Sequence, residues 1–170
     1  ERIESHVFDC WSAVGMSGLL LSCAPTAKIS LTSSVLKTAI GIAAPANRVI
    51  KIQRVSFGFF GVSATDSPVE CWMRVASNDG TATSMTIANF MCAKRRPASS
   101  TMQSTCKHTY TVEPTTIAGI IHATAVHPQS GHDSLVFDNL GIEIDGSDTY
   151  PLFTLRFLSA VNTSVLPTIW

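Results

Sequence analysis

The sequence predicts an all-β protein, and two observations carry this prediction. Apolar and polar residues alternate over short runs such as Val69 to Val75 and Thr105 to Val112, a pattern typical of strands with one buried face. Pro, Gly, Asn and Asp separate these runs, and stretches with the period of an amphipathic helix are nearly absent. Short strands with turns at this spacing indicate a sandwich or a barrel.

The first half of the chain supplies four expected strands. They are Val35 to Ile42, Val49 to Phe59, Val69 to Val75 and Met85 to Cys92. In the first, Leu36, Thr38, Ile40 and Ile42 are expected on one face. In the second, each face changes from polar to apolar, which indicates a bulge near Gly58. Ala43 to Asn47 and Asn78 to Gly80 are expected turns, and Gly61 to Pro68 is an expected loop.

The second half continues in the same way. Strands are expected at Thr105 to Val112, Ile117 to Val126, Ser134 to Phe137, Gly141 to Ile144, Tyr150 to Leu158 and Asn162 to Trp170. Glu113 to Thr115 is read as a turn, and Asp145 to Asp148 is read as a tight hairpin turn. Lys94 to Gln103 and His127 to Gly131 are expected loops.

The charge content narrows the classes of partner. The chain has 170 residues, a formal net charge of zero and 14% charged residues, against roughly 25% in an ordinary soluble domain. A neutral chain offers no electrostatic basis for binding nucleic acid or an anionic membrane. Few charges and 45% hydrophobic residues instead favour association with other protein surfaces. The alternative is an unusually large core.

The cysteines are expected to be small buried hydrophobic residues, as in a protein folded in a reducing cytoplasm. They number five (Cys10, Cys23, Cys71, Cys92 and Cys106), and none forms a CxxC motif. A Cys92–Cys106 bridge between neighbouring strands is the alternative. The apolar segment Val14 to Ala24 is too short to span a bilayer and follows acidic residues, so an N-terminal arm or strand is expected there.

The order of the turn motifs resembles a phage jelly-roll virion protein family of the capsid decoration or cement type. The matching motifs are Lys37 to Ile40, Ala44 to Arg48, Phe57 to Gly61, Ala64 to Val69, Asp79 to Thr81, Glu113 to Thr115, Val126 to Gly131, Ala160 to Asn162 and the end at Trp170. The resemblance covers residues 35–170. Residues 1–34 and Met85 to Gln103 depart from the pattern, and capsid-specific contacts are one use for such segments.

The resemblance implies a single jelly-roll sandwich of eight antiparallel strands in residues 35–170, with residues 1–34 as an N-terminal arm or extra strand. It implies a structural virion protein on the capsid exterior, made in the host cytoplasm, whose partners are the major capsid protein and its own copies in a homotrimer. It implies no catalytic, metal-binding or cofactor-binding residues and no cofactor. The alternative is a receptor- or glycan-binding head fibre or tip module on the same fold.

A few residue groups are candidates for chemistry or contacts. A metal-dependent jelly-roll enzyme would use His127 and His132, with His122 and Asp133 nearby in the sequence. The usual HxH pattern is absent, so these residues read more simply as loop histidines beside a Pro-Gln-Ser-Gly turn. The acidic residues from Asp138 to Asp148 read more simply as turn residues, and Lys94 to Arg96 as a solvated loop. In the glycan-binding alternative, exposed aromatic residues would form a shallow surface cleft (Trp72, Tyr150 and Trp170). Apolar residues of the N-terminal arm are expected to dock onto neighbouring subunits or to fold back over the chain's own sheet (Phe8, Trp11 and Leu19 to Leu21).

Overall fold

The computed structural model is all-β, with antiparallel sheets, as the sequence predicts. It describes residues 21–60, 67–85, 92–94, 103–115, 118–130, 132–137 and 141–169. The strands are β1 (Leu21–Cys23), β2 (Ile29–Leu31), β3 (Leu36–Ala43), β4 (Val49–Ile52), β5 (Arg54–Phe60), β6 (Val69–Ala76), β7 (Thr81–Ser84), β8 (Cys92–Lys94), β9 (Thr105–Val112), β10 (Ile120–Val126), β11 (His132–Val136), β12 (Ile142–Asp145), β13 (Leu152–Leu158) and β14 (Thr163–Ile169). A short 3-10 turn, Pro128–Ser130, joins β10 to β11.

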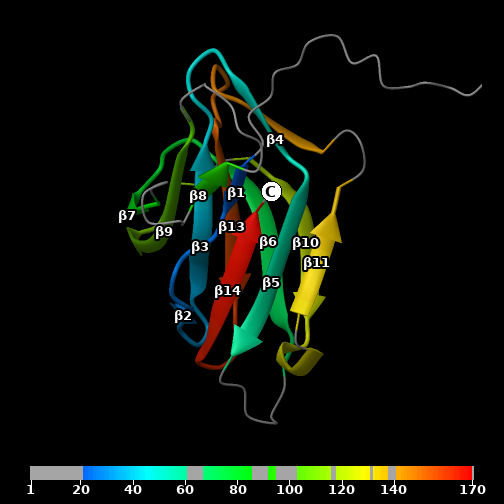
Figure 1. Ribbon diagram of the computed structural model, residues 1–170. Helices are drawn as coiled ribbons and strands as arrows, with labels where there is room; N and C mark the ends of the chain where they lie inside the picture. Colours follow the sequence, from blue (N-terminus) through cyan, green and yellow to red (C-terminus); the bar gives the residue numbers. More distant parts are fainter. Residues whose placement is uncertain are drawn as a thin grey trace, which may run out of the picture.

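The strands form two layers (Figure 1). The front sheet has the order β11-β5-β14-β1-β8, with β2 also paired to β14, and the back sheet has the order β10-β6-β13-β3-β9-β7. A separate two-stranded ribbon pairs β12 with β4. Because β1 and β2 both pair with β14, residues 21–31 are part of the sandwich.

Four antiparallel pairs are nested along the chain. The innermost pair is β6 with β10, the next is β5 with β11, then β3 with β13, and the outermost is β2 with β14. In the sequence, the segment from β7 to β9 comes between β6 and β10, the two strands of the innermost pair. In space, its strands β9 and β7 extend the back sheet beyond β3.

Apolar side chains from the inner faces of both sheets form the core. Phe57 and Phe59 of β5 meet Phe157 of β13 in edge-to-face contacts, with ring centroids 5.1 to 5.8 Å apart. Such pairs add about 0.5–1.5 kcal/mol each beyond the area they bury. On β6, Val69, Cys71 and Met73 are fully buried. This confirms the alternation predicted for that strand.

The irregularity predicted near Gly58 lies instead at Gln53. The single strand expected from Val49 to Phe59 is divided into β4 and β5 at that residue. Ile50 and Ile52 face the core on one side of the break and Val55 on the other, so the inward-facing parity changes at Gln53. The cause is a change of partner, because β4 pairs with β12 whereas β5 pairs with β11.

A bulge in β3 makes the faces of this strand differ from the prediction. Ile40 pairs with Leu155 and Thr38 pairs with Arg156, which leaves Ala39 without a cross-strand partner. The bulge keeps Ile40 and Ile42 in the core, as expected, but places Thr38 beside Arg156 on the outer face. Asp145 to Asp148 also differs from the prediction. It is a tight turn, but not a hairpin, because β12 and β13 pair with different strands.

The remaining strand predictions vary in outcome. Thr105 to Val112 is confirmed as β9, and the last two strands are confirmed within two residues. The predicted strand from Ile117 begins later, at Ile120. Most of the predicted Met85 to Cys92 strand lies outside the described residues, and so does most of the Gly61 to Pro68 loop.

Candidate functional site

The outer face of the front sheet is almost without charge. Alternation along β5 and β14 turns most of their larger apolar residues inward. The outward residues of β5 are the charged Arg54 at one end, the large Phe60 at the other, and small residues between them. We call a set of outward residues the serine face, and it consists of Ser30, Ser56, Gly58, Ser134, Ser164, Leu166 and Thr168. These residues come from adjacent strands in register, so they form one continuous surface.

The charged residues described beside the serine face are both engaged. The Nε of Arg54 donates to the Oγ of Ser134 at 2.7 Å. The Nζ of Lys28 lies 4.0 Å from the centre of the Phe60 ring. A charge-poor surface of this kind is typical of the desolvated centre of a protein interface.

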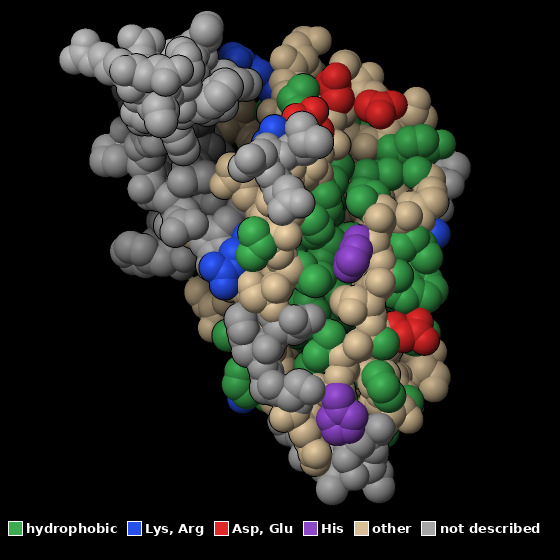
Figure 2. Space-filling view, turned by 90° about the vertical axis from the view of Figure 1, so that its right-hand side faces the viewer, with side chains coloured by type: hydrophobic (Ala, Val, Ile, Leu, Met, Phe, Trp, Pro, Cys, Tyr) green, Lys and Arg blue, Asp and Glu red, His purple; other side chains and the backbone are tan. Residues whose placement is uncertain are grey.

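An apolar seam runs along the side where the edge strands β10 and β11 lie, and we define it by Ile120, Ile121, Val136 and Phe137. Figure 2 faces this side and shows hydrophobic side chains gathered along it, with histidines beside them. Ile120, Ile121 and Val136 are 47%, 41% and 68% exposed. The rings of His122 and Phe137 meet edge to face at 6.4 Å, so the two edge strands are in contact.

The outer face of the back sheet carries the opposite chemistry. We call its charged group the arginine cluster, consisting of Lys37, Arg74, Glu113 and Arg156. The carboxylate of Glu113 lies 3.4 Å from the guanidinium of Arg156 and 3.4 Å from the ammonium of Lys37. It also accepts a hydrogen bond from the backbone N–H of Thr38 at 2.9 Å. One carboxylate therefore serves three donors.

Because the arginine cluster is partly buried, its charges need the carboxylate of Glu113 to remain stable in the folded protein. Arg156 is only 7% exposed. Burial lowers the pKa of its guanidinium, the carboxylate of Glu113 raises it, and the nearby charge of Arg74 lowers it further. The residues after Glu113 stay against the same sheet, because the carbonyl of Thr115 accepts from the N–H of Ser77 at 3.0 Å. The cluster thus anchors the segment that leaves β9.

This cluster is not predicted from the sequence, where Glu113 to Thr115 has only the residues of a turn. The available signal was Arg156, the only charged residue in the otherwise uncharged, mostly apolar run Leu152 to Leu158. A single charge in a central strand needs a buried partner. The sequence does not show which carboxylate supplies it.

The histidines considered for a metal site are not brought together by the described geometry. His122 lies on β10 against Phe137, whereas His127 follows that strand and its Nδ1 accepts from the N–H of Gln129 at 3.2 Å. The backbones of His132 and Asp133 pair with β5, and their side chains lie outside the described part. Across the described ranges, no group of three or more His, Cys, Asp or Glu residues is placed to hold a metal ion.

The C-terminal acidic residues have local partners. Both the N–H and the hydroxyl of Ser147 donate to Asp145, and these bonds lower the pKa of its carboxyl group. Asp148 accepts from the N–H of Thr149 at 2.6 Å. Glu143 forms an exposed ion pair with Lys51 at 3.0 Å. Asp138 lies outside the described residues.

The cysteines are buried where the structure describes their side chains. Cys23, Cys71 and Cys106 are at most 2% exposed, which confirms their predicted place in the core. The sulfurs of Cys23 and Cys106 are 2.9 Å apart, although one residue lies in each sheet. Cys92 is on β8 of the front sheet and Cys106 on β9 of the back sheet, so they are not on the neighbouring strands that a direct bridge presupposed.

Other candidate contact residues divide between described and undescribed positions. Trp72 and Tyr150 are half-buried. Outside the description lie Phe8, Trp11, Trp170, Arg95 and Arg96, together with the side chains of Leu21 and Lys94. In the segments that the structure does describe, no helix has the length and apolar character needed to cross a membrane.

Comparison with known proteins assigns no family. No protein-family model, curated protein or solved structure matches this chain.

Proposed function

We propose that this protein is a structural virion protein that decorates or cements the capsid of a tailed phage. The observation that carries the proposal is the serine face, an ordered sheet surface with very few charges. Specific protein interfaces bury about 1,200–2,000 Å² and are depleted of charge at their centres. We assign this surface to contact with the major capsid protein lattice, on the outside of the virion.

The proposal includes a jelly-roll fold. A jelly roll has eight strands in two sheets, arranged as two Greek keys. The nested pairing of β2 with β14, β3 with β13, β5 with β11 and β6 with β10 supports this assignment. The front sheet then contributes β2, β14, β5 and β11, and the back sheet β3, β13, β6 and β10. In this assignment the segment from β7 to β9 is an insertion.

We further propose that copies of the chain associate through the apolar seam as a homotrimer. Edge strands of monomeric proteins commonly carry charged residues or proline that block further pairing. The edge strand β10, Ile120 to Val126, has neither, and it exposes two isoleucines. The trimeric state itself comes from the family resemblance.

The test begins with purified virions of the phage that encodes this chain. Mass spectrometry should detect the protein in a fixed ratio to the major capsid protein, and a density map should place the serine face against the shell. Its absence from purified virions would refute the proposal. A Thr168→Glu variant, with a charge on the serine face, should fold but not be incorporated. The control Thr105→Glu, on β9, should be incorporated normally.

Self-association has its own test. Light scattering after size-exclusion chromatography should give a trimer for the native chain and a monomer for Ile121→Glu. The control Val112→Glu changes a residue that is 58% exposed on β9, away from the seam, and should remain trimeric. A monomeric native chain would refute the trimer without refuting capsid binding.

A further inference from the structure

On the outer face of the back sheet, β10 places small residues beside larger residues of β6, and we call this surface the trough. Ala123 is paired with Trp72 and Ala125 with Glu70. Both alanines are exposed, and their single methyl groups keep the floor of the trough low. The trough opens into a concavity of about 510 Å³, lined in part by Glu70, Ala125 and Ser159.

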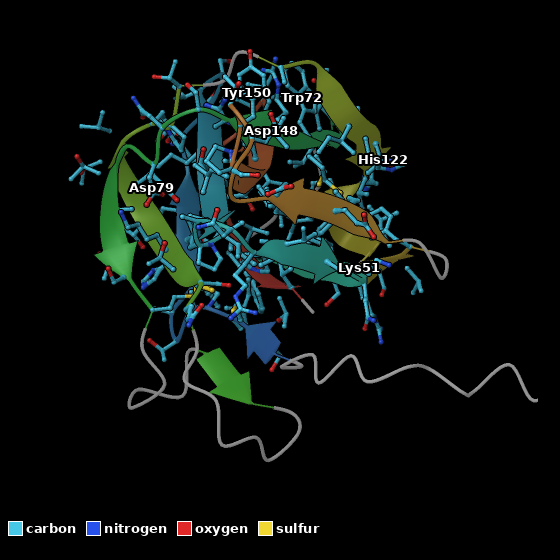
Figure 3. All side chains as sticks on the ribbon, turned by 90° about the horizontal axis from the view of Figure 1, so that it is seen from above. Lys51, Trp72, Asp79, His122, Asp148 and Tyr150 are labelled. Atoms are coloured by element: carbon cyan, nitrogen blue, oxygen red, sulfur yellow. The ribbon has the colours of Figure 1, made fainter. Side chains whose placement is uncertain are left out.

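Trp72 is held in a fixed position above this floor. Its indole N–H donates to the carboxylate of Glu70 at 3.0 Å, and the guanidinium of Arg74 lies 5.6 Å from the ring centre. The side chain is half-buried, and it lies on the opposite side of the molecule from Lys51 (Figure 3). An aromatic ring fixed in this way provides a preorganised stacking surface.

Arg74 brings positive charge to one end of the trough, and the carboxylate of Glu70 lies at the other end. The arginine cluster holds three cations, Lys37, Arg74 and Arg156, and one carboxylate, Glu113, which gives it a net charge of +2 (+3 − 1). The Nε of Arg74 is buried and, among the described residues, has no hydrogen-bond partner. A guanidinium binds a carboxylate through paired, charge-assisted hydrogen bonds.

We propose that this trough binds an oligosaccharide that contains a carboxylate-bearing sugar unit. The ring of Trp72 packs on the apolar face of a sugar, Glu70 accepts hydrogen bonds from sugar hydroxyls, and Arg74 donates to the carboxylate. The three residues alternate along β6, so they lie along one line, with neighbours about 6.6 Å apart. An open, linear trough of this kind suits a chain of several sugar rings.

The binding test uses isothermal titration with defined probes. The acidic probes are oligogalacturonate, oligoalginate and sialyllactose, and the matched neutral probe is methyl-esterified oligogalacturonate. At least one acidic probe should bind, and for oligogalacturonate the ester should bind about tenfold or more weakly. Failure of all the acidic probes at about 10 mM would overturn the proposal. Equal binding of acid and ester would overturn the role of the carboxylate.

Three variants locate the binding. Arg74→Gln should weaken acidic binding about tenfold and leave the weak ester binding unchanged. Trp72→Phe should weaken both. Ala125→Gln fills the floor at an exposed position, so it should abolish binding without lowering the unfolding temperature. The control Arg48→Gln removes an exposed arginine outside the trough and should bind as the native chain does.

Two outcomes would assign the surface differently. If Arg48→Gln weakens binding as much as Arg74→Gln, the attraction is a general charge effect and the proposal fails. If a poly-glutamate peptide binds in the trough and competes with the sugars, the surface recognises acidic peptides instead. The proposal does not rest on capsid attachment, because Thr168→Glu should lose incorporation into virions and keep sugar binding.

Discussion

The two outer faces of this sandwich differ in their content of charged residues. The arginine cluster places four charged residues on the back sheet, with Arg156 almost fully buried, and uses them to hold the segment after β9. The serine face presents hydroxyl groups and small residues, with Lys28 and Arg54 at its margins. Buried charge here fixes the chain to itself, whereas the serine face carries almost no charge and is the surface that we propose contacts the capsid.

The largest effect should come from removing the shared carboxylate. Glu113→Gln leaves Arg156 and Lys37 without an anion, and breaking a buried ion pair costs about 3–5 kcal/mol, of which we expect about 2–3 because Glu113 is 30% exposed. The measurement is the free energy of unfolding in urea. The control Glu143→Gln breaks the exposed pair with Lys51 and should cost less than about 1 kcal/mol. Equal losses would mean that the cluster does not anchor the fold.

A second prediction concerns a close contact on the outer face of the back sheet, between β3 and β9. A Cβ atom at Gly41 would collide with the hydroxyl oxygen of Tyr110, whose side chain is 1% exposed. Gly41→Ala should therefore destabilise the protein by about 2 kcal/mol, and Tyr110→Phe should recover part of that loss in a double-mutant cycle. Gly119→Ala, with no atom within 4 Å of the new methyl, serves as the control. Additive effects would show that the two residues do not compete for space.

A third change removes a polar group that the arginine cluster does not use. The hydroxyl of Thr38 is buried and has no hydrogen-bond partner in the described part of the chain. Thr38→Val should leave stability unchanged or raise it by up to about 1 kcal/mol, because a buried hydroxyl without a partner is unfavourable. On the serine face, Ser134→Ala should change stability by no more than about 0.5 kcal/mol. A large loss for Thr38→Val in urea unfolding would contradict this account.

The smallest effect is confined to acidic pH. His108 on β9 is 8% exposed, and burial lowers the pKa of its imidazole from 6.5. As the pH falls below 6.5 the unfolded chain takes up a proton on this residue, whereas the folded chain takes it up only at lower pH, so stability should decrease. His108→Asn should flatten that decrease in urea unfolding curves recorded across this range. His127→Asn is the control, and equal slopes for all three proteins would contradict the prediction.

Much of the fold follows from the sequence, since periodicity identifies strands such as β6 and β9 without structural help. Periodicity cannot reveal a change of partner, because β4 and β5 form one continuous run and differ only in the strands beside them. For the same reason, Asp145 to Asp148 has the residues of a hairpin turn although it joins strands with different partners.

The candidate sites were harder to predict from the sequence for a related reason. Glu113 and Arg156 are far apart in the sequence, and only the pairing of β3 with β13 brings Thr38 and Arg156 to the same place. Trp72 was singled out from sequence, but the exposed alanines beside it became informative only through the register of β10 with β6. A low trough floor depends on which strands are neighbours.

The position of β14 has a consequence for synthesis in the cell. The ribosome makes this strand after all the other described strands, yet β14 lies between β5 on one side and both β1 and β2 on the other. Until β14 emerges, the front sheet has a gap, and the edge of β5 beside Phe57 and Phe59 lacks its partner. The front sheet therefore cannot form completely until β14 has left the ribosome, and the nascent chain is expected to need chaperone protection during that interval.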